Sequence, residues 1–192
     1  TGEHATTQLC CSWLQKKVHS GMRVLDYGAG SGILGMASLL YGAKEAVGVD
    51  IDRDSLLAAA SNAKANDLFS SFKCYVPSEE ADSVEDNKSP LIPGLGRPGF
   101  RIDPSAEDQD VSRIPASAKD FELTVANILA KPLIKLCPEI ARLTAPGGLL
   151  GLSGVLEEQA GGVMEAYGEY FDDMKVDGVQ NGWCLITGVR KA

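Results

Sequence analysis

Hydrophobic positions along the chain switch between short continuous runs, which are typical of buried strands, and helical spacing. The continuous runs predict strands at residues 23–27, 46–49, 71–76, 121–126 and 149–152. Helical spacing between most of these runs predicts helices at residues 33–41, 54–66, 132–143 and 157–171. Two further strand patterns, 174–179 and 183–189, are joined by Gln180-Asn181-Gly182, and an Asn-Gly pair is typical of a β-hairpin. Strands that alternate with helices form a parallel sheet with helices on both faces, so we expect an α/β fold with an antiparallel C-terminal hairpin.

Residues 77–118 lack both periods and differ in composition from the rest of the chain. They hold six of the nine prolines, and their nine acidic and four basic side chains give a net charge of −5. Such a stretch cannot bury much apolar surface, and a fold tolerates a long loop because closure costs grow slowly with loop length. We therefore expect one domain, 1–192, that carries an acidic, proline-rich insertion in a surface loop, mobile at least in part.

Length and composition agree with one globular domain: the 192 residues are 44% hydrophobic and 23% charged. No apolar run approaches the ~18 residues that a membrane-spanning helix needs. The net charge of −8 argues against non-specific nucleic-acid binding, which normally uses a basic patch. Five cysteines without a C-x-x-C spacing predict reduced thiols in an intracellular protein, and argue against a disulfide scaffold or a zinc site.

The most specific motif is a glycine-rich turn between a predicted strand and a predicted helix, Asp26-Tyr27-Gly28-Ala29-Gly30-Ser31-Gly32. Glycine permits backbone angles that other residues avoid and lets a ligand approach the main chain. The helix that follows presents free N–H groups at its start. Asp50 ends the next strand, 20 residues after Gly30. At that spacing an acid accepts hydrogen bonds from a ribose in a nucleotide-binding βαβ unit.

Two ligands compete for this unit, and a purely structural glycine turn is the third interpretation. Gly30-x-Gly32-x-x-Gly35 formally matches the dinucleotide pattern, which would indicate a nicotinamide-dependent oxidoreductase. Asp26, directly before the glycines, is poorly placed for a pyrophosphate because close anions repel. It suits a ligand with a cationic end and no phosphate. S-adenosylmethionine is such a ligand, with a ribose diol for Asp50 and an ammonium for the Asp26 side, so the residues favour it over NAD.

Asn127 closes the fourth predicted strand, at the carboxyl edge where open α/β sheets bind ligands. Its main-chain and side-chain carbonyls can accept hydrogen bonds from an amine and aim the amine lone pair at a methyl group. Taken alone, an amide at a strand end is often only a turn former.

The first residues of the chain offer hydroxyls and a histidine. Thr6 and Thr7 stand just ahead of a predicted helix, where hydroxyls are typical N-caps. His4 is a reserve candidate for a general base, although a single histidine in a loop is more often a surface or structural residue. Trp13 and Trp183 lie in apolar patterns and are interpreted as core residues rather than as a cage for a cation.

Several motifs are spread from end to end of the chain, outside residues 77–118. They are Thr1-Gly2-x-His4-x-Thr6-Thr7-x-Leu9-Cys10, Asp26-x-Gly28-x-Gly30-Ser31-Gly32-Ile33-Leu34, Gly48-x-Asp50-Ile51-Asp52, Ala126-Asn127-Ile128-Leu129-Ala130-x-Pro132-Leu133, Gly147-Gly148-x-Leu150-x-Leu152-Ser153-Gly154-x-Leu156 and Trp183-Cys184. On these motifs the sequence resembles the PrmA family, the methyltransferases of the large-subunit ribosomal protein L11.

The resemblance implies a Rossmann-like, seven-strand class I methyltransferase sheet with S-adenosylmethionine as the methyl donor. It also implies methylation of lysine ε-amines or of the N-terminal α-amine of that ribosomal protein, without a metal, a membrane or direct nucleic-acid contact. Relatives of the family methylate other proteins, such as the electron-transfer flavoprotein β-subunit, so the substrate has an alternative. The family's cofactor positions match Thr7, Gly28, Asp50 and Asn127. The remaining cofactor-binding candidates are Asp26, Gly30, Gly32 and Ile51.

The chain departs from the family pattern in three ways. The family's N-terminal substrate-recognition domain is absent, which implies that this chain alone binds the cofactor but methylates poorly. The segment 77–118 is not part of the pattern, and Ala29 replaces a common cysteine, which should be harmless. A non-catalytic, cofactor-binding scaffold is the remaining alternative, and the retained Asp50 and Asn127 argue against it.

The chain begins with Thr1 rather than Met and shows no signal or transit peptide, so we expect a piece of a longer protein. A bacterial cytoplasmic location fits this pattern. A chloroplast or mitochondrial location, with a leader already removed, fits it as well.

Overall fold

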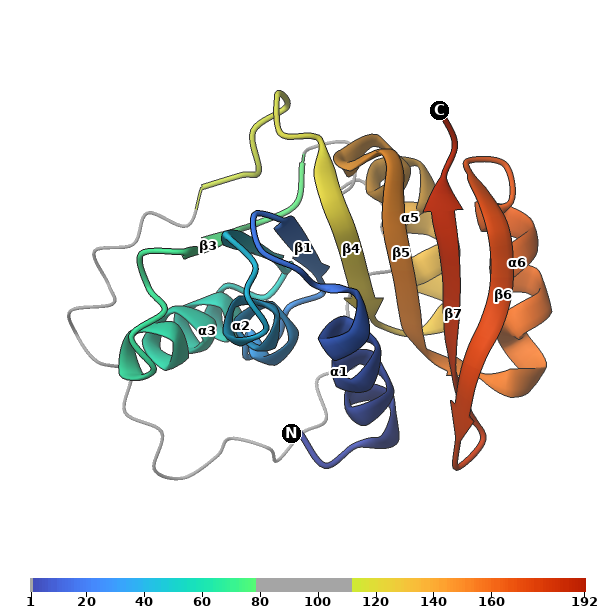
Figure 1. Ribbon diagram of the computed structural model, residues 1–192, viewed down its shortest axis with the longest axis horizontal. Coiled ribbons are helices and arrows are strands. Elements are labelled where there is room, and N and C mark those ends of the chain that lie inside the picture. Colours follow the sequence, from blue (N-terminus) through green and yellow to red (C-terminus); the bar gives the residue numbers. More distant parts are fainter. Residues whose placement is uncertain (1, 79–111) are drawn as a thin grey trace.

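The computed structural model describes residues 2–78 and 112–192, and among these residues seven strands form one sheet in the order β3-β2-β1-β4-β5-β7-β6 (Figure 1). The strands are β1 (Arg23–Tyr27), β2 (Glu45–Val49), β3 (Phe72–Tyr75), β4 (Phe121–Asn127), β5 (Thr144–Leu156), β6 (Phe171–Gln180) and β7 (Trp183–Arg190). The helices are α1 (Ala5–Lys17), α2 (Ile33–Leu40), α3 (Arg53–Ala65), α5 (Ala130–Leu143) and α6 (Ala160–Tyr167), with a short 3-10 turn, η2 (Glu157–Gln159), before α6.

The strand order reverses at β1. The chain adds β2 and β3 on one side of β1 and then returns to place β4 on the other side. Strands β1 to β5 pair in parallel, whereas β7 runs antiparallel to both β5 and β6. The predicted α/β sheet, mostly parallel with a C-terminal antiparallel hairpin, is therefore confirmed. Open sheets of this kind bind ligands at the carboxyl ends of the strands beside the reversal.

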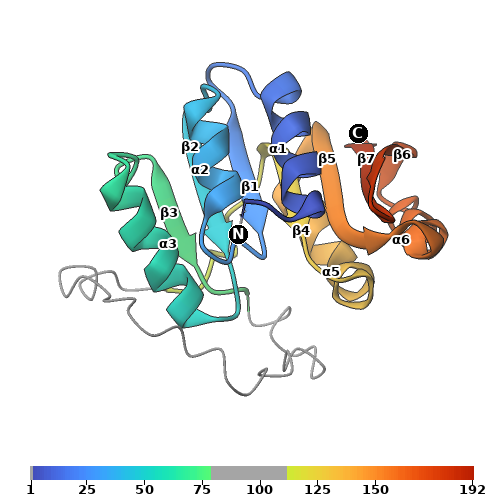
Figure 2. The ribbon, with the colours of Figure 1, turned by 90° about the horizontal axis from the view of Figure 1, so that it is seen from below.

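Side chains that alternate along β1 explain the two helical layers, because successive residues of a strand point to opposite faces. Val24 belongs to a buried cluster with Trp13 of α1 and Leu34 of α2. Leu25, the next residue, belongs to a different cluster with Leu133 of α5. Helices α1, α2 and α3 thus cover one face of the sheet, and α5 and α6 cover the other (Figure 2).

The C-terminal hairpin forms at the predicted Asn-Gly pair. Asn181 and Gly182 have φ angles of 54° and 78°, so both lie in the left-handed region. A two-residue turn with both residues left-handed matches the right-handed twist of the flanking strands, and Asn-Gly is its preferred sequence. The turn sets the pairing of Gln180 with Trp183 that begins the hairpin.

Element boundaries differ from the prediction mainly in the C-terminal third. The helix predicted over 157–171 ends at Tyr167, where the N–H of Gly168 donates to the Met164 carbonyl. Phe171 is 1% exposed and begins β6 instead. A buried apolar residue satisfies both periods over so short a run, so the pattern alone does not locate this change. Strand β5 also starts earlier than predicted, at Thr144.

Most of the predicted insertion over 77–118 lies outside the described residues, namely 79–111. Its described end packs against the fold. Ile114 is 3% exposed, and its N–H donates to the Val76 carbonyl at 2.8 Å. The Val76 N–H in turn donates to the Ser112 carbonyl at 3.0 Å. The residues that close the segment before β4 are therefore part of the packed domain, which one isolated isoleucine in a polar stretch does not reveal.

The five cysteines are all free thiols, and all but Cys11 are buried. No helix among the described residues is long and apolar enough to cross a membrane. Within the same residues, no group of three or more His, Cys, Asp or Glu side chains could hold a metal ion.

Candidate functional site

The predicted cofactor-binding segments meet where β1, β2 and β4 end. Tyr27 of β1 pairs with Val49 of β2 on one side and with Ala126 of β4 on the other. The next residue of each strand, respectively Gly28, Asp50 and Asn127, therefore emerges at the same level of the sheet edge. This register brings together residues that are far apart in sequence, as the motifs predicted.

The glycine turn requires three left-handed residues. Gly28, Gly30 and Gly32 have φ angles of +80°, +52° and +79°. The N–H groups of Gly28 and Ala29 donate to the Val49 carbonyl at 2.7 and 3.0 Å, which fastens the turn to the end of β2. A side chain at any of the three glycines would strain the backbone.

The three glycines differ in what lies beside them. A Cβ on Gly28 would approach the Cγ2 methyl of Ile128 to 2.3 Å, and a Cβ on Gly32 would approach Phe72 and Ala59 to 3.0 Å. A Cβ on Gly30 would meet nothing within 4 Å. Packing within the protein thus accounts for Gly28 and Gly32, whereas Gly30 faces open space through which a ligand can approach the backbone.

Asp50 connects the glycine turn to the start of α3. One carboxylate oxygen accepts a hydrogen bond from the Gly30 N–H at 2.8 Å, and the other accepts from the Asp52 N–H at 3.0 Å. Burial raises the pKa of Asp50, and the backbone N–H bonds act against that rise. A carboxylate offers about four acceptor positions, so Asp50 keeps capacity for the hydroxyls of a ribose.

Asp26 is buried beneath the first turn of α2 and is not exposed at the surface of the site. Its Oδ2 accepts a hydrogen bond from the Gly35 N–H at 2.8 Å, and the residue is 1% exposed. Its Oδ1 is buried and has no hydrogen-bond partner among the described residues. Burial raises the pKa of Asp26 to about 7, the Gly35 bond opposes this rise, and Asp50 adds to it.

The amino end of α1 closes the site from the side. The side-chain amide of Asn127 donates to the Thr7 hydroxyl at 3.5 Å. Thr7 is 5% exposed and sits inside the first turn of α1. Gly2 approaches the first residue of α2, since a Cβ on it would lie 3.2 Å from Ile33. The threonine segment therefore joins the glycine turn and the end of β4, as its place in the motif set suggested.

The prediction that Thr6 or Thr7 caps α1 is wrong. The N-cap is His4, whose Nδ1 accepts from the Thr6 N–H at 3.4 Å and lies 2.8 Å from the Thr6 hydroxyl. Residues preferred at the N-cap accept hydrogen bonds through a side-chain oxygen, whereas His4 accepts through an imidazole nitrogen. The usual N-cap preferences therefore did not identify His4. The His4 ring also meets the edge of Trp183, with 5.3 Å between centroids.

The two tryptophans differ in their surroundings. Trp13 is 4% exposed and packs over Gly151 of β5, as a core residue should. Trp183 is only partly buried and contacts His4, so its interpretation as a core residue is only partly correct.

Two large apolar side chains stand exposed at the rim of the site. Ile51, directly after Asp50, is 41% exposed, and Leu129, two residues after Asn127, is 65% exposed. Leu129 precedes the first turn of α5 without a side-chain cap.

Sequence patterns missed two residues that shape the site. Phe72 of β3 fills the space left by three glycines, because a Cβ on Gly32, Gly35 or Gly48 would lie 2.4 to 3.0 Å from its ring. Ile128 fills the space beside Gly28, and its main chain lies against Gly154 of β5. Each follows or lies in a predicted strand and carries no polar group, so no chemical signal marks it.

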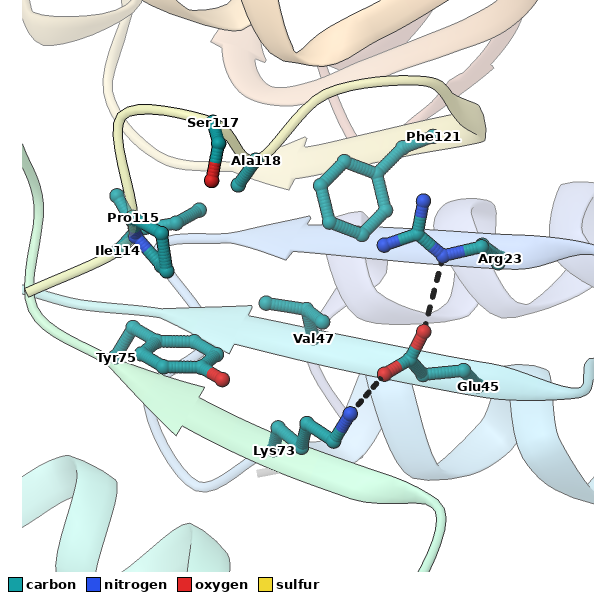
Figure 3. Close-up of a pocket in the computed structure, with 10 residues that line it drawn as sticks. All are labelled: Arg23, Glu45, Val47, Lys73, Tyr75, Ile114, Pro115, Ser117, Ala118 and Phe121. Atoms are coloured by element: carbon teal, nitrogen blue, oxygen red, sulfur yellow. Dashed lines mark hydrogen bonds and ion pairs between the residues drawn. The ribbon is translucent and has the colours of Figure 1, made fainter. Parts of the chain in front are cut away.

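A cavity of about 200 Å³ lies elsewhere, between residues 114–118 and side chains of β1, β2, β3 and β4 (Figure 3). Its lining runs from Arg23 and Glu45, the first residues of β1 and β2, to Tyr75, the last residue of β3. Its charged wall is an internal network, in which Glu45 pairs with Arg23 at 2.9 Å and with Lys73 at 2.5 Å. Phe121 lies under the Arg23 guanidinium, 4.7 Å from it. None of the candidate residues lines this cavity, so it is not the site that the motifs predict.

The residues at the carboxyl edge fit a cationic nucleoside better than a dinucleotide. The helix N–H group that a pyrophosphate would use, that of Gly35, is already bound by the Asp26 carboxyl group. A buried carboxyl oxygen without a partner attracts a cation and repels a phosphate. Asp50 and the open space at Gly30 match a ribose, and Asn127 offers acceptors to an amine.

Comparison with known proteins gives one consistent family. The model of the family described as ribosomal protein L11 methyltransferase (PrmA) matches residues 1–92 and 103–191. A ribosomal protein L11 methyltransferase of Pseudomonas paraeruginosa is 39% identical over 193 residues, covering 100% of this chain and 53% of its own length. The ribosomal protein L11 methyltransferase of Acinetobacter baylyi is 36% identical over 190 residues, which cover 99% of this chain and 53% of the relative. The chain thus spans about half the length of these curated relatives.

Solved structures show the same architecture. A ribosomal protein L11 methylase from Lactobacillus delbrueckii subsp. bulgaricus superposes with a TM-score of 0.69 at 25% identity, over 100% of this chain and 81% of the other. A TehB-like SAM-dependent methyltransferase from Corynebacterium glutamicum superposes with a TM-score of 0.61 over 95% and 87%, and at 14% identity this likeness concerns the fold alone.

Proposed function

The chain belongs to the ribosomal protein L11 methyltransferase (PrmA) family, and from this premise we propose that it is the S-adenosylmethionine-binding catalytic domain of a protein N-methyltransferase. The observation that carries the proposal is the convergence of three strand ends, which places Gly30, Asp50 and Asn127 at one edge of the sheet. The relatives named as ribosomal protein L11 methyltransferases, and the solved L11 methylase at 25% identity, support the same interpretation.

The chain's own residues divide the binding of S-adenosylmethionine between them. Asp50 accepts the ribose hydroxyls with the acceptor capacity that its bonds to Gly30 and Asp52 leave. Ile51 contacts the adenine with its exposed side chain. The buried Asp26 carboxyl favours the amino-acid end of the ligand through charge.

The cofactor supplies an electrophilic methyl group on a sulfonium, which an amine can take in one displacement without a covalent enzyme intermediate or a metal. The protein's contribution is positioning, because reactants held ~3–3.5 Å apart and aligned have already lost the entropy that a collision in solution would cost. Asn127 provides this by accepting hydrogen bonds from the amine with its carbonyl oxygens. Thr7 accepts the Asn127 amide hydrogen at 3.5 Å and so orients the side-chain oxygen toward the crevice.

The amine must lose a proton before it reacts. For a lysine with a pKa of ~10.4, the neutral form costs about 4.6 kcal/mol at pH 7. Desolvation beside a cation lowers the pKa of the amine, so the proton can leave to solvent before the displacement. We therefore assign no obligatory general base. His4, whose Nδ1 is engaged with Thr6, remains the reserve candidate.

We place the acceptor amines on the large-subunit ribosomal protein L11, as lysine ε-amines, the N-terminal α-amine or both. The names of the relatives support this substrate. The chain spans only about half their length, so recognition of the protein substrate can involve residues that lie outside it. Another protein, such as the electron-transfer flavoprotein β-subunit, is the alternative substrate.

Two measurements test the proposal. Thermal unfolding with S-adenosylhomocysteine should raise Tm, and NAD should leave Tm unchanged; the reverse result would indicate an oxidoreductase. Mass spectrometry of ribosomal protein L11, incubated with S-adenosylmethionine and the full-length protein, should then show added methyl groups on amines. Binding of S-adenosylhomocysteine without methylation of either protein substrate would favour a non-catalytic scaffold.

A further inference from the structure

Ile128 is held between the glycine turn and strand β5. A Cβ on Gly28 would lie only 2.3 Å from the Cγ2 methyl of Ile128, so the methyl fills the space beside the glycine. The backbone of Ile128 lies against Gly154, since a Cβ there would be 2.5 Å from the Ile128 carbonyl oxygen, 2.8 Å from the carbonyl carbon and 3.0 Å from the nitrogen. Ile128 is therefore held from two sides, and its nitrogen belongs to the peptide that joins it to Asn127.

Gly154 belongs to an irregular part of β5. The pairing of β5 with β7 shifts register between Leu152 and Val155, and Gly154 has a φ angle of +82°. The preceding residue, Ser153, is fully buried, and its hydroxyl donates to the Cys184 carbonyl of β7 at 2.8 Å. The Ser153 carbonyl accepts the Ile128 N–H at 3.1 Å. The irregular part of β5 is thus hydrogen-bonded directly to Ile128, the residue after Asn127.

The contacts of Gly154 cannot be relieved by a rotamer change. The atoms near its missing Cβ are all backbone atoms, whereas the atom nearest to Gly28 is the end of a side chain. A side chain at Gly154 must therefore displace the backbone of Ile128. The carbonyl group of Ile128 belongs to the 128–129 peptide, but its nitrogen belongs to the 127–128 peptide, and the Asn127 carbonyl group is part of that second peptide.

We propose that Gly154 is a positioning residue for methyl transfer: its lack of a side chain lets the backbone of Ile128 approach β5, which sets the position of the Asn127 carbonyl that receives the amine. This inference rests on the proposed function, because it needs Asn127 to bind the acceptor. It assigns a role to the Ser153-Gly154 bulge that neither cofactor binding nor the core requires.

The test compares Gly154→Ala with Gly147→Ala in the full-length protein. Gly147 has a φ angle of +75° and nothing within 4 Å of its missing Cβ, so its alanine variant carries the same backbone strain without the collision. Gly154→Ala should lower kcat about 100-fold, as misplacements near 1 Å do, and should lower the affinity for S-adenosylhomocysteine much less than it lowers kcat. Gly147→Ala should keep the kcat of the parent protein.

Two outcomes would overturn the inference. One is a kcat of Gly154→Ala equal to that of Gly147→Ala. The other is a loss of S-adenosylhomocysteine affinity that matches the loss of kcat. If Gly154→Ala does not fold, Ser153→Ala, which removes the bond to the Cys184 carbonyl, should lower kcat while the Kd stays unchanged, and an unchanged kcat there would refute the role of the bulge. A parent protein that neither binds S-adenosylhomocysteine nor transfers methyl groups would instead refute the proposed function.

Discussion

The carboxylate of Asp50 accepts a hydrogen bond of 2.8 Å from the backbone N–H of Gly30, and thereby ties the end of β2 to the middle of the glycine turn. Gly30 is also the glycine of this turn beside which the protein leaves open space. The residue that is expected to bind the ribose therefore also shapes the turn beside which we expect the ribose to bind. Loss of the carboxylate should affect both at once.

Asp50→Ala is expected to weaken binding of S-adenosylhomocysteine by about 10- to 100-fold, the range for a lost hydrogen bond to a charged group. Titration calorimetry measures this directly. Asp52→Ala is the matched control, because Asp52 lies two residues further on and caps α3 through the Asp54 N–H. It should lower stability and leave the affinity unchanged. Equal affinities of Asp50→Ala and the parent protein would remove Asp50 from the site.

Asn127→Ala should lower kcat more than it lowers cofactor affinity, because the side-chain oxygen is assigned to the incoming amine. Single-turnover kinetics and calorimetry on the same preparation separate the two effects. Thr7→Val, which removes only the hydroxyl that accepts the Asn127 amide hydrogen, should give a smaller loss of kcat in the same direction. Parallel losses of kcat and affinity in Asn127→Ala would contradict the amine-binding role.

Asp26 should make stability depend on pH. Burial raises its pKa to about 7 in the folded protein, above the usual value of 3.8. Between these values the folded state keeps a proton that the unfolded state has lost, so the free energy of unfolding falls as pH rises from about 4 to about 7. Denaturant titrations between about pH 4 and about pH 7 should show that the free energy of unfolding of Asp26→Asn falls less steeply with pH than that of the parent protein. An identical slope in the two proteins would show that Asp26 is not the group responsible.

The same group should link cofactor binding to pH. A ligand ammonium near the carboxyl favours its ionised form, so binding below about pH 7 releases a proton. The affinity for S-adenosylhomocysteine should accordingly rise toward pH 7 in the parent protein. In Asp26→Asn this dependence should disappear, and calorimetry in buffers of different ionisation enthalpy counts the protons directly.

The sequence predicted the positions of Gly28, Asp50 and Asn127 because each follows a readable apolar strand, and parallel strands end at one edge. It did not predict Ile128 or Gly154. Their contact lies beside a register irregularity between β5 and β7, and local sequence patterns contain no information about register across strands. The capping role of His4 was missed for a different reason, since two neighbouring threonines offered the more usual acceptors.

Phe72 shows the same limit in the core. In the sequence it is an ordinary strand residue, but in the fold its ring occupies the space beside Gly32, Gly35 and Gly48. Phe72→Ala should lower the free energy of unfolding by about 3–5 kcal/mol, as other truncations of buried aromatic residues do. Phe69→Ala, at a residue that is 40% exposed, should cost less than about 1 kcal/mol. Urea denaturation followed by circular dichroism compares the two, and similar losses would contradict this assignment.

Gly28 and Ile128 should be energetically coupled, because the methyl group of one fills the space that the other leaves. Gly28→Ala should weaken S-adenosylhomocysteine binding, and the loss should be smaller when Ile128→Ala has removed the Cγ2 methyl. A double-mutant cycle should give a coupling free energy of about 0.5–3 kcal/mol. Gly30→Ala provides the contrast, because its Cβ meets no protein atom and its loss of affinity should be the same with or without Ile128→Ala. Additive losses for Gly28 and Ile128 would mean that the glycine is needed for its left-handed backbone alone.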